Sequence, residues 1–239
     1  MKDRSFFYYD ELDSTMLEHK RLQEHCKGLI CVRANTQDDG KGRDDRIWLS
    51  PPGGLWITFD LKYPTVVPSF ALFLGYCLHR ELIRLFAPLQ DGLSIKWTND
   101  IMYKGKKLGG ILCKNHPGHY IIGIGLNTNN EIDPELGKFG AISLKQILNC
   151  EISNEQLCYS VIEAVESHEK VLSHSITYIT YCNEQLFGRN SMAQIDVGTA
   201  PFEAEILGID LTGALIIRKS RGEIVNVHSG SILGLQAFS

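Results

Sequence analysis

The sequence lacks any long hydrophobic run, although 44% of its 239 residues are hydrophobic. A membrane-spanning helix needs about 20 consecutive apolar residues. The charged start, residues 1–4, leads into a short aromatic segment and not into the apolar core of a signal peptide. We therefore expect a globular cytoplasmic protein that has no contact with a membrane. A chain of this length can bury a full core in one large domain, with or without a small second one.

The sequence also has no excess of positive charge and no C-x-x-C arrangement of cysteines. The formal net charge is −4, whereas a protein that neutralises DNA phosphates needs a basic surface. The seven cysteines are scattered, odd in number and nowhere arranged as C-x-x-C. We therefore expect no DNA binding and reduced thiols, as in a cytosolic protein.

The most informative segment is residues 37–52, QDDGKGRDDRIWLSPP. Its glycines let main-chain N–H groups approach a ligand closely, and its basic residues supply positive charge. The residues concerned are Gly40, Gly42, Lys41, Arg43 and Arg46. This composition predicts an anion-binding loop, although a solvated basic hairpin tip would look the same.

Two later segments make the pattern specific: residues 94–114, SIKWTNDIMYKGKKLGGILCK, and residues 120–129, YIIGIGLNTN. In order and spacing, the three segments resemble those of the biotin protein ligases. The catalytic domain of that family carries a glycine-arginine loop before W-x-S-P, then K-W-P-N-D, K-L-x-G-I-L and G-I-G-x-N. The resemblance implies a ligase that uses ATP to attach biotin to a lysine of a biotin carboxyl carrier domain, through a biotinyl-5′-adenylate. In the family the acceptor is usually a subunit of acetyl-CoA carboxylase.

The family likeness also implies the fold and the domain organisation. It predicts an α+β protein with a mixed β-sheet and packing helices, similar to the class II aminoacyl-tRNA synthetases, followed by a small C-terminal barrel that resembles a Src-homology-3 domain. We expect a catalytic domain at residues 1–188 and the barrel at residues 189–239. The DNA-binding N-terminal module of some members has no room before Ser5, so the monofunctional type is expected, as a monomer or a homodimer.

Hydrophobic periodicity predicts most of the individual elements. Strands are expected at residues 5–11, 29–35, 54–61, 95–97, 108–113 and 120–126, and in the C-terminal part at 202–207, 214–218 and 224–227. Helices are expected at residues 13–26, 69–86, 143–148 and from Asn154 as far as Tyr181.

Joining a carboxylic acid to an amine through an adenylate requires cations near the α-phosphate, a metal ion on the phosphates and a shielded intermediate. Lys107, which matches the family lysine before Leu-x-Gly-Ile-Leu, and Arg43 are the predicted catalytic residues. Asn99 and Asp100 match the family Asn-Asp pair and are suited to Mg²⁺, a hard cation that takes oxygen ligands. By itself an Asn-Asp pair is more often a turn.

The resemblance implies a larger set of residues that bind biotin or the adenylate. Ser14 and Thr15 match a family Ser-Thr pair that contacts the biotin ring system, although they could simply cap a helix. Asn127 could be part of a turn at the end of a strand, and Trp48 could be part of the core. The complete predicted set is Ser14, Thr15, Met16, Gln37, Gly40, Lys41, Gly42, Arg43, Trp48, Lys107, Gly109, Gly110, Gly123, Gly125 and Asn127.

The sequence departs from the family pattern at three notable places. Met16 stands where an asparagine is usual, Thr98 stands where a proline is usual, and Asp45 stands where the loop of the family has a glycine. Asp44 and Asp45 add negative charge to the loop, which predicts weaker closure over an adenylate and a lid that is mobile without ligand.

Two alternative functions are compatible with parts of the pattern. A lipoate or octanoyl ligase has a similar fold, but its R-R-x-S-G-G-G-x-V-Y-H-D motif is absent, whereas W-x-S-P-x-G-G-L is present at residues 48–55. A non-catalytic biotin- or nucleotide-binding regulator would not need the phosphate-handling residues Lys107, Asn99 and Asp100.

Overall fold

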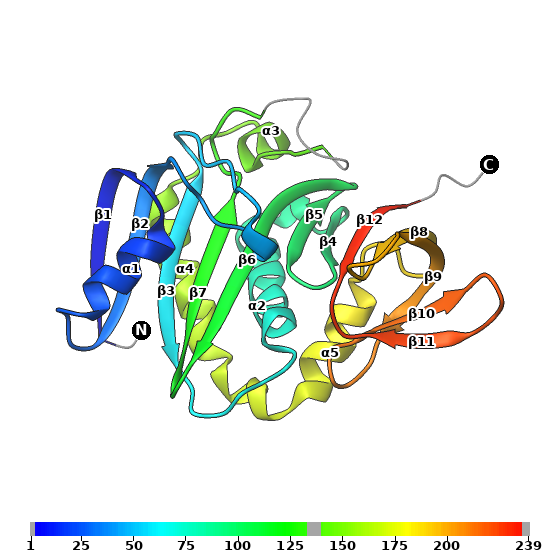
Figure 1. Ribbon diagram of the computed structural model, residues 1–239. Helices are drawn as coiled ribbons and strands as arrows, with labels where there is room; N and C mark the ends of the chain where they lie inside the picture. The colour runs from blue at the N-terminus through cyan, green and yellow to red at the C-terminus, as the bar shows by residue number, and fades with distance from the viewer. Residues whose placement is uncertain (1–2, 133–139, 236–239) are drawn as a thin grey trace. The chain divides into compact units, whose positions relative to one another are not determined.

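The computed structural model describes residues 3–132 and 140–235 (Figure 1). The chain forms two compact units, each assembled from several stretches of the sequence. Unit 1 comprises Met1–Val66, Leu108–Pro134 and Ala141–Glu169, and unit 2 comprises Val67–Lys107, Glu135–Gly140 and Lys170–Ser239.

Unit 1 is built on a mixed β-sheet in the order β1-β2-β3-β7-β6. Strands β1 and β2 are parallel, and the other neighbours in this order are antiparallel. The predicted mixed sheet is therefore confirmed. The bounds are β1 (Arg4–Leu12), β2 (Leu29–Gln37), β3 (Leu55–Lys62), β6 (Lys106–His116) and β7 (His119–Leu126).

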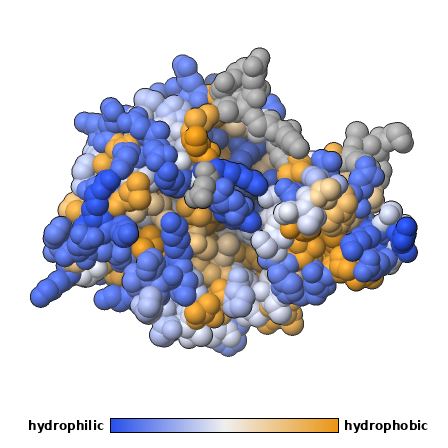
Figure 2. Space-filling model, viewed as in Figure 1, coloured by the Kyte–Doolittle hydropathy of each residue, from blue (hydrophilic) through white to orange (hydrophobic). Residues whose placement is uncertain are grey.

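Helices α1 (Thr15–Gln23) and α4 (Asn154–Ser167) cover the two faces of this sheet, with α1 in front and α4 behind in Figure 1. Because helices cover both faces, the first seven of the eight residues of β3 are buried. The surface over β1 and α1 in Figure 2 is mostly hydrophilic, in agreement with the exposed charged residues Lys20 and Arg21 of α1. A short helix, α3 (Leu144–Leu148), begins at a capping box formed by Ser143 and Gln146.

A buried ion cluster joins three elements of unit 1. The guanidinium of Arg4 on β1 lies 3.0 Å from Asp60 on β3 and 3.0 Å from Glu166 on α4. Asp60 also accepts a hydrogen bond from the backbone N–H of Ile30 on β2. A single arginine thus ties β1 to β3 and to α4, which lie far from it in the sequence.

Unit 2 contains two packed helices, α2 (Phe70–Leu85) and α5 (Ser175–Glu184), and the hairpin β4 (Leu93–Lys96) and β5 (Asp100–Tyr103). The helices are linked by polar contacts: Ser69 Oγ lies 2.6 Å from the hydroxyl of Tyr178, and His79 Nδ1 lies 2.8 Å from the hydroxyl of Tyr181. His79 is completely buried, as expected of a structural residue.

The C-terminal part of unit 2 is an antiparallel five-stranded sheet in the order β11-β10-β9-β8-β12. A break in register between Ile216 and Ile217 bends the pairing of β10 with β9. The sequence predicts a small β-barrel here. The antiparallel strands and glycine turns of that prediction are present, and their closure into a barrel stays a prediction. The bounds are β8 (Met192–Asp196), β9 (Phe202–Ile209), β10 (Leu215–Lys219), β11 (Ile224–Val227) and β12 (Ser231–Leu235).

Three predictions of secondary structure are wrong in detail. The helix expected from Asn154 to Tyr181 is broken, because α4 ends at Ser167 and a 3₁₀ segment, Glu169–Ser173, precedes α5. Strand β5 is absent from the predicted set, and β4 ends at Lys96, one residue before Trp97.

The predicted domain boundary at residues 188 and 189 lies between α5 and β8 and stays a prediction. No helix in residues 3–132 and 140–235 is long and apolar enough to cross a membrane.

Candidate active site

The basic loop of unit 1 is a closed hairpin. Isolated bridges pair Gln37 with Ser50 and Lys41 with Ile47, and the backbone N–H of Trp48 donates to the carbonyl of Gly40 at 2.8 Å. A single 3₁₀ turn, Arg43–Asp45, forms the tip. The backbone therefore presents Arg43 from a tight turn that short-range hydrogen bonds hold in shape.

Gly40 is required for this closure. A Cβ atom at residue 40 would lie 2.3 Å from the carbonyl oxygen of Trp48 and 2.7 Å from Ser50 Oγ. The close packing within the loop therefore explains why residue 40 has no side chain. At the tip, Asp44 has φ 54°, a left-handed conformation in which aspartate is tolerated better than most residues.

The cations of the loop have different surroundings. The ammonium of Lys41 forms an exposed ion pair with Asp39 at 2.5 Å. Arg43 lies close enough to Cys113 on β6 to affect its thiol: burial raises the pKa of Cys113 to about 11, and the positive charge of Arg43 partly offsets that rise. Arg43 is therefore placed beside the sheet.

The start of α1 carries a buried hydroxyl group without a partner. Ser14 is the N-cap residue, but its side chain makes no capping hydrogen bond. Its Oγ is fully buried and has no hydrogen-bond partner among the residues that the structure describes. Leaving such a group unsatisfied costs about 1–3 kcal/mol. The hydroxyl does not form the plain helix cap that the sequence also allowed, and its contact with a ligand stays a prediction.

The next residue links α1 to the basic loop. The hydroxyl of Thr15 and its backbone N–H both donate to the side-chain oxygen of Gln37, at 3.0 and 2.8 Å. Gln37 in turn donates from Nε2 to Ser50 Oγ at 2.7 Å, and Thr15 Oγ1 lies 2.8 Å from the hydroxyl of Thr58 on β3. This chain of hydrogen bonds fixes the base of the loop beside the unpartnered Ser14.

Glycines on β7 make room for two of the predicted site residues. A Cβ atom at Gly123 would lie 3.1 Å from the sulfur of Met16, and one at Gly125 would lie 2.6 Å from the indole nitrogen of Trp48. Trp48 also packs edge-on against Trp56, with ring centroids 6.3 Å apart. Met16 and Trp48 therefore lie directly against the backbone of the same strand.

The glycines of β6 belong to the same region. A Cβ atom at Gly109 would lie 2.4 Å from Leu126 Cδ2, and Gly110 pairs with Gly125 across the strands. At the end of β7, the backbone N–H of Asn127 donates to the carbonyl of Leu108 at 2.9 Å. The side-chain oxygen of Asn127 accepts from Asn130 at 3.1 Å, which fixes the orientation of its amide.

Unit 1 thus brings together one group of predicted site residues around the start of α1, the basic loop and strands β6 and β7. Its members are Ser14, Thr15, Met16, Gln37, Gly40, Trp48, Gly109, Gly110, Gly123 and Gly125. Thr58 and Ser50, which complete the hydrogen-bond chain, were not predicted, because their contacts lie across the sheet and the loop.

Unit 2 contains a second group, centred on Asp100. Lys107 Nζ lies 2.8 Å from its Oδ1, and Lys96 Nζ lies 3.2 Å from its Oδ2. Burial alone would raise the pKa of Asp100, but the charges of Lys107 and Lys96 outweigh it and hold the pKa below its usual value. Lys96 was not assigned a role from the sequence, although its cross-strand pairing with Asp100 follows from the hairpin.

The predicted magnesium site at Asn99 and Asp100 stays a prediction, and an ion there would share the carboxylate of Asp100 with two lysines. Both carboxylate oxygens already contact ammonium groups, and the side-chain oxygen of Asn99 accepts from Thr98 at 3.4 Å. In the parts of the chain that the structure describes, no group of three or more His, Cys, Asp or Glu side chains is arranged to hold a metal.

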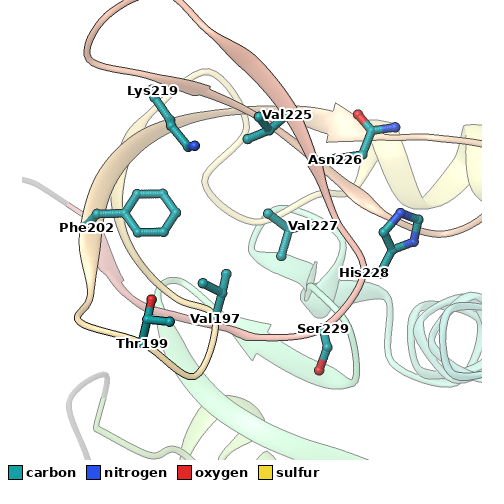
Figure 3. Close-up of a pocket in the computed structure, with 9 residues that line it drawn as sticks. All are labelled: Val197, Thr199, Phe202, Lys219, Val225, Asn226, Val227, His228 and Ser229. Carbon is teal, nitrogen blue, oxygen red and sulfur yellow. The ribbon is translucent and has the colours of Figure 1, made fainter.

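A separate hollow of about 430 Å³ lies in the C-terminal sheet of unit 2 (Figure 3). Phe202, Val197 and Val227 point into it, and Lys219 lies at its edge. Within the described residues, its lining contains no residue of the predicted site, so this hollow is not the candidate active site.

A mixed sheet that carries a basic loop, a buried unpartnered hydroxyl and a glycine-lined strand defines an α+β domain built to bind a small ligand with an anionic group. Residues 6–127 match the family model described as the biotin/lipoate A/B protein ligase family. The chain belongs to this family.

Individual relatives agree with that assignment. The chain is 30% identical over 243 residues to the bifunctional ligase/repressor BirA of Bacillus subtilis. The alignment covers 94% of this chain and 72% of that protein. It is 28% identical over 130 residues to the biotin–[acetyl-CoA-carboxylase] ligase of Paracoccus denitrificans, which covers 52% of this chain and 54% of that protein. The structure of the biotin protein ligase from Aquifex aeolicus in complex with biotin and ATP has the same fold, with a TM-score of 0.81 at 24% identity over 97% of this chain and 98% of that one.

Proposed function

We propose that the protein is a biotin–protein ligase that uses ATP to attach biotin to a lysine of a biotin carboxyl carrier domain. The observation that carries this proposal is that residues 6–127 match the biotin/lipoate A/B protein ligase family on the fold of a biotin protein ligase. The buried Oγ of Ser14, beside the loop that Thr15 and Gln37 anchor, supports a ligand contact at the start of α1. The relatives with biotin in their names support biotin as that ligand.

In unit 1, biotin would bind against Ser14, Thr15, Met16 and Trp48, on the floor formed by the glycines of β6 and β7. The loop residues Gly40, Lys41, Gly42 and Arg43 would face the phosphates of the nucleotide, since backbone N–H groups and a guanidinium are suited to phosphate oxygens. Asn127 would orient the ligand at the end of β7.

The reaction would proceed in two steps. In the first, a carboxylate oxygen of biotin bonds to the α-phosphorus of ATP and pyrophosphate leaves. In the second, the amine of the acceptor lysine bonds to the acyl carbon, AMP leaves, and the amine loses a proton. Lys107 and Arg43 would stabilise the negative charge on the α-phosphate in both steps, with Lys107 aimed by its ion pair with Asp100.

Magnesium is proposed to enter with the phosphates of ATP, because Mg²⁺ commonly keeps substrate phosphates among its ligands. The acceptor is proposed to be an acetyl-CoA carboxylase subunit, in line with the name of the Paracoccus relative. We further propose a cytoplasmic monomer or homodimer. We propose that it does not bind DNA, because a net charge of −4 disfavours binding to phosphates.

Lipoate ligation is the second candidate, because the matching family model covers biotin and lipoate ligases. The absence of R-R-x-S-G-G-G-x-V-Y-H-D from the sequence disfavours it. A third candidate, a regulator that binds biotin without turnover, is disfavoured by the paired lysines on Asp100, which a simple binder would not need.

One experiment separates the three candidates. The purified protein is incubated with ATP, Mg²⁺ and either biotin or octanoate, and pyrophosphate release is followed, then the mass gain of a biotin carboxyl carrier domain. We expect pyrophosphate release and mass gain with biotin, and neither with octanoate. Turnover with octanoate alone would identify a lipoate-type ligase, and biotin binding without pyrophosphate release would identify a regulator.

A further inference from the structure

Helix α1, which begins at the residues predicted to contact biotin, is attached to the sheet of unit 1 by polar side chains. The structure describes all nine residues of α1, and the buried ones among them are Thr15 and His19. Residues four apart on a helix share one face, and this face lies against β2 and β3 (Figure 1). The position of α1 therefore depends largely on what these two side chains meet.

Both side chains meet strand β3. Thr15 Oγ1 lies 2.8 Å from the hydroxyl of Thr58, and His19 Nε2 lies 3.8 Å from Oδ1 of Asp60. Four residues of a helix rise about 6.0 Å, and two residues of an antiparallel strand rise about 6.8 Å. Because these repeats differ by less than about 1 Å, α1 and β3 run in the same direction with two contacts in step.

Asp60 is a fixed point on the sheet. Its Oδ1 accepts hydrogen bonds from the guanidinium of Arg4 on β1 at 3.0 Å and from the backbone N–H of Ile30 on β2 at 2.7 Å. Burial alone would raise the pKa of Asp60, but His19, Ile30 N–H and Arg4 outweigh it and hold the pKa below its usual value. His19 is therefore aimed at a carboxylate that two other strands hold in place.

The imidazole of His19 is not explained by packing alone. The residue is fully buried, and neither ring nitrogen has a hydrogen-bond partner among the residues that the structure describes. Nε2 is too far from Asp60 for a hydrogen bond but close enough for electrostatic attraction. An apolar side chain would fill this place without the cost of burying polar nitrogens. Attraction to Asp60 is the gain that distinguishes the imidazole from such a side chain.

We infer that His19 is a positioning residue for biotin, because its contact with Asp60 fixes how α1 lies on β3 and so places Ser14 and Thr15 for the ligand. With the Thr15 contact alone, α1 could pivot about one point, whereas two contacts fix its direction. The inference rests on the proposed function and deepens it, since it assigns the placement of the biotin-binding end of α1 to a residue that does not itself touch biotin.

The first test measures biotin affinity and the rate of adenylate formation separately in His19→Leu. Calorimetric titration with biotin should give a Kd about tenfold above that of the wild type, the scale of one hydrogen bond to the ligand. The single-turnover rate at saturating biotin and ATP should stay within about twofold, because Lys107 and Arg43 are unchanged. His19→Met, which has a more adaptable apolar side chain, should behave in the same way.

Two further variants serve as controls. His19→Gln replaces the imidazole with an amide N–H donor and should bring the Kd to within about threefold of the wild type, since it can still reach Asp60. His25→Leu makes the same change as His19→Leu at an exposed histidine just beyond the end of α1, and should leave the Kd unchanged. An equal loss of affinity in His19→Gln and His19→Leu would mean that the shape of the ring matters and not its contact with Asp60, and would overturn the inference.

A third measurement depends on neither biotin nor activity. Amide hydrogen exchange, followed by mass spectrometry, reports the local opening of a helix. In His19→Leu, exchange in residues 15–23 should be several-fold faster, whereas exchange in α4 should not change. Unchanged exchange in α1 overturns the inference, and so does faster exchange with unchanged biotin affinity. If the wild type binds no biotin, the proposed function fails, and the exchange result still decides whether His19 holds α1 on β3.

Discussion

The ammonium group of Lys107 lies 2.8 Å from Oδ1 of Asp100, and both residues belong to unit 2. The ion pair restricts a side chain that otherwise has four rotatable bonds, so the charge is held in place before the reaction begins. Electrostatic stabilisation is most effective when it needs no rearrangement during the reaction.

Lys107→Ala should therefore abolish adenylate formation while the fold stays intact. Loss of a preorganised group of this kind costs about 10²–10³-fold in rate. Pyrophosphate release with biotin and ATP measures the rate, and thermal unfolding checks the fold. Adenylate formation at the normal rate in this variant would refute the catalytic assignment of Lys107.

Ser14→Ala should change stability and affinity in opposite directions. Without ligand, the variant no longer buries an unsatisfied hydroxyl, so the free energy of unfolding should rise by about 1 kcal/mol. Affinity for biotin should fall about tenfold, because a hydrogen bond to the ligand is lost. Denaturant unfolding and calorimetric titration measure the two effects. Loss of stability together with unchanged affinity would mean that Ser14 has a structural role only.

Gly125→Ala should disturb the site through Trp48. The new Cβ would lie 2.6 Å from the indole nitrogen of Trp48, closer than atoms in contact allow, so the indole must move. We expect the KM for biotin to rise at least several-fold. Gly234→Ala is the matched control, because a Cβ there meets no atom within 4 Å. Equal KM values for the two variants would argue against a role of the Trp48 position in binding.

Asp45→Gly should slow the dissociation of the adenylate from the loop. The substitution removes a negative charge that lies between Arg43 and Arg46 in the sequence, and in water a unit charge close to another is worth about 1 kcal/mol, or several-fold in rate. Asp45→Asn separates charge from backbone freedom, because it removes the charge without adding glycine. Release of labelled adenylate is the measurement, and an unchanged or faster release in both variants would show that the carboxylate helps to shape the loop.

Stability should fall in acid because of His79. Burial lowers the pKa of His79 to about 4, and a hydrogen bond with the backbone of Leu93 offsets this only in part. In the unfolded chain the pKa is about 6.5, so below that value the unfolded state binds a proton that the folded state excludes. The stability contributed by neutral His79 is therefore complete above about pH 6.5 and is lost as the pH falls towards 4.

His79→Gln, which cannot titrate, should show a weaker dependence of the unfolding temperature on pH between 7 and 4.5. The difference between the two proteins should be on the order of a few kcal/mol at the acid end. Thermal unfolding at several pH values in this range measures it. Parallel curves for the wild type and the variant would mean that other groups cause the acid sensitivity.

Patterns among residues close together in the sequence determined the basic loop and many of the helices and strands. The glycines and arginines of residues 37–52 predicted a tight basic loop, and the pattern of apolar residues predicted β3, β7 and α2 almost to their ends. These features depend on local backbone preferences and on burial of one face, which are properties of consecutive residues. The order of the three motifs was sufficient to indicate the family.

Contacts between residues distant in the sequence were decided only by the tertiary structure. Ser14 could have been an ordinary helix cap, but in the folded chain its hydroxyl is buried and has no hydrogen-bond partner among the residues that the structure describes. The Asn-Asp pair indicated a metal site, but the hairpin and β6 bring Lys96 and Lys107 to the two oxygens of Asp100. The sequence contains both lysines and the carboxylate, but their charges interact strongly only when folding removes the water between them and fixes their distances.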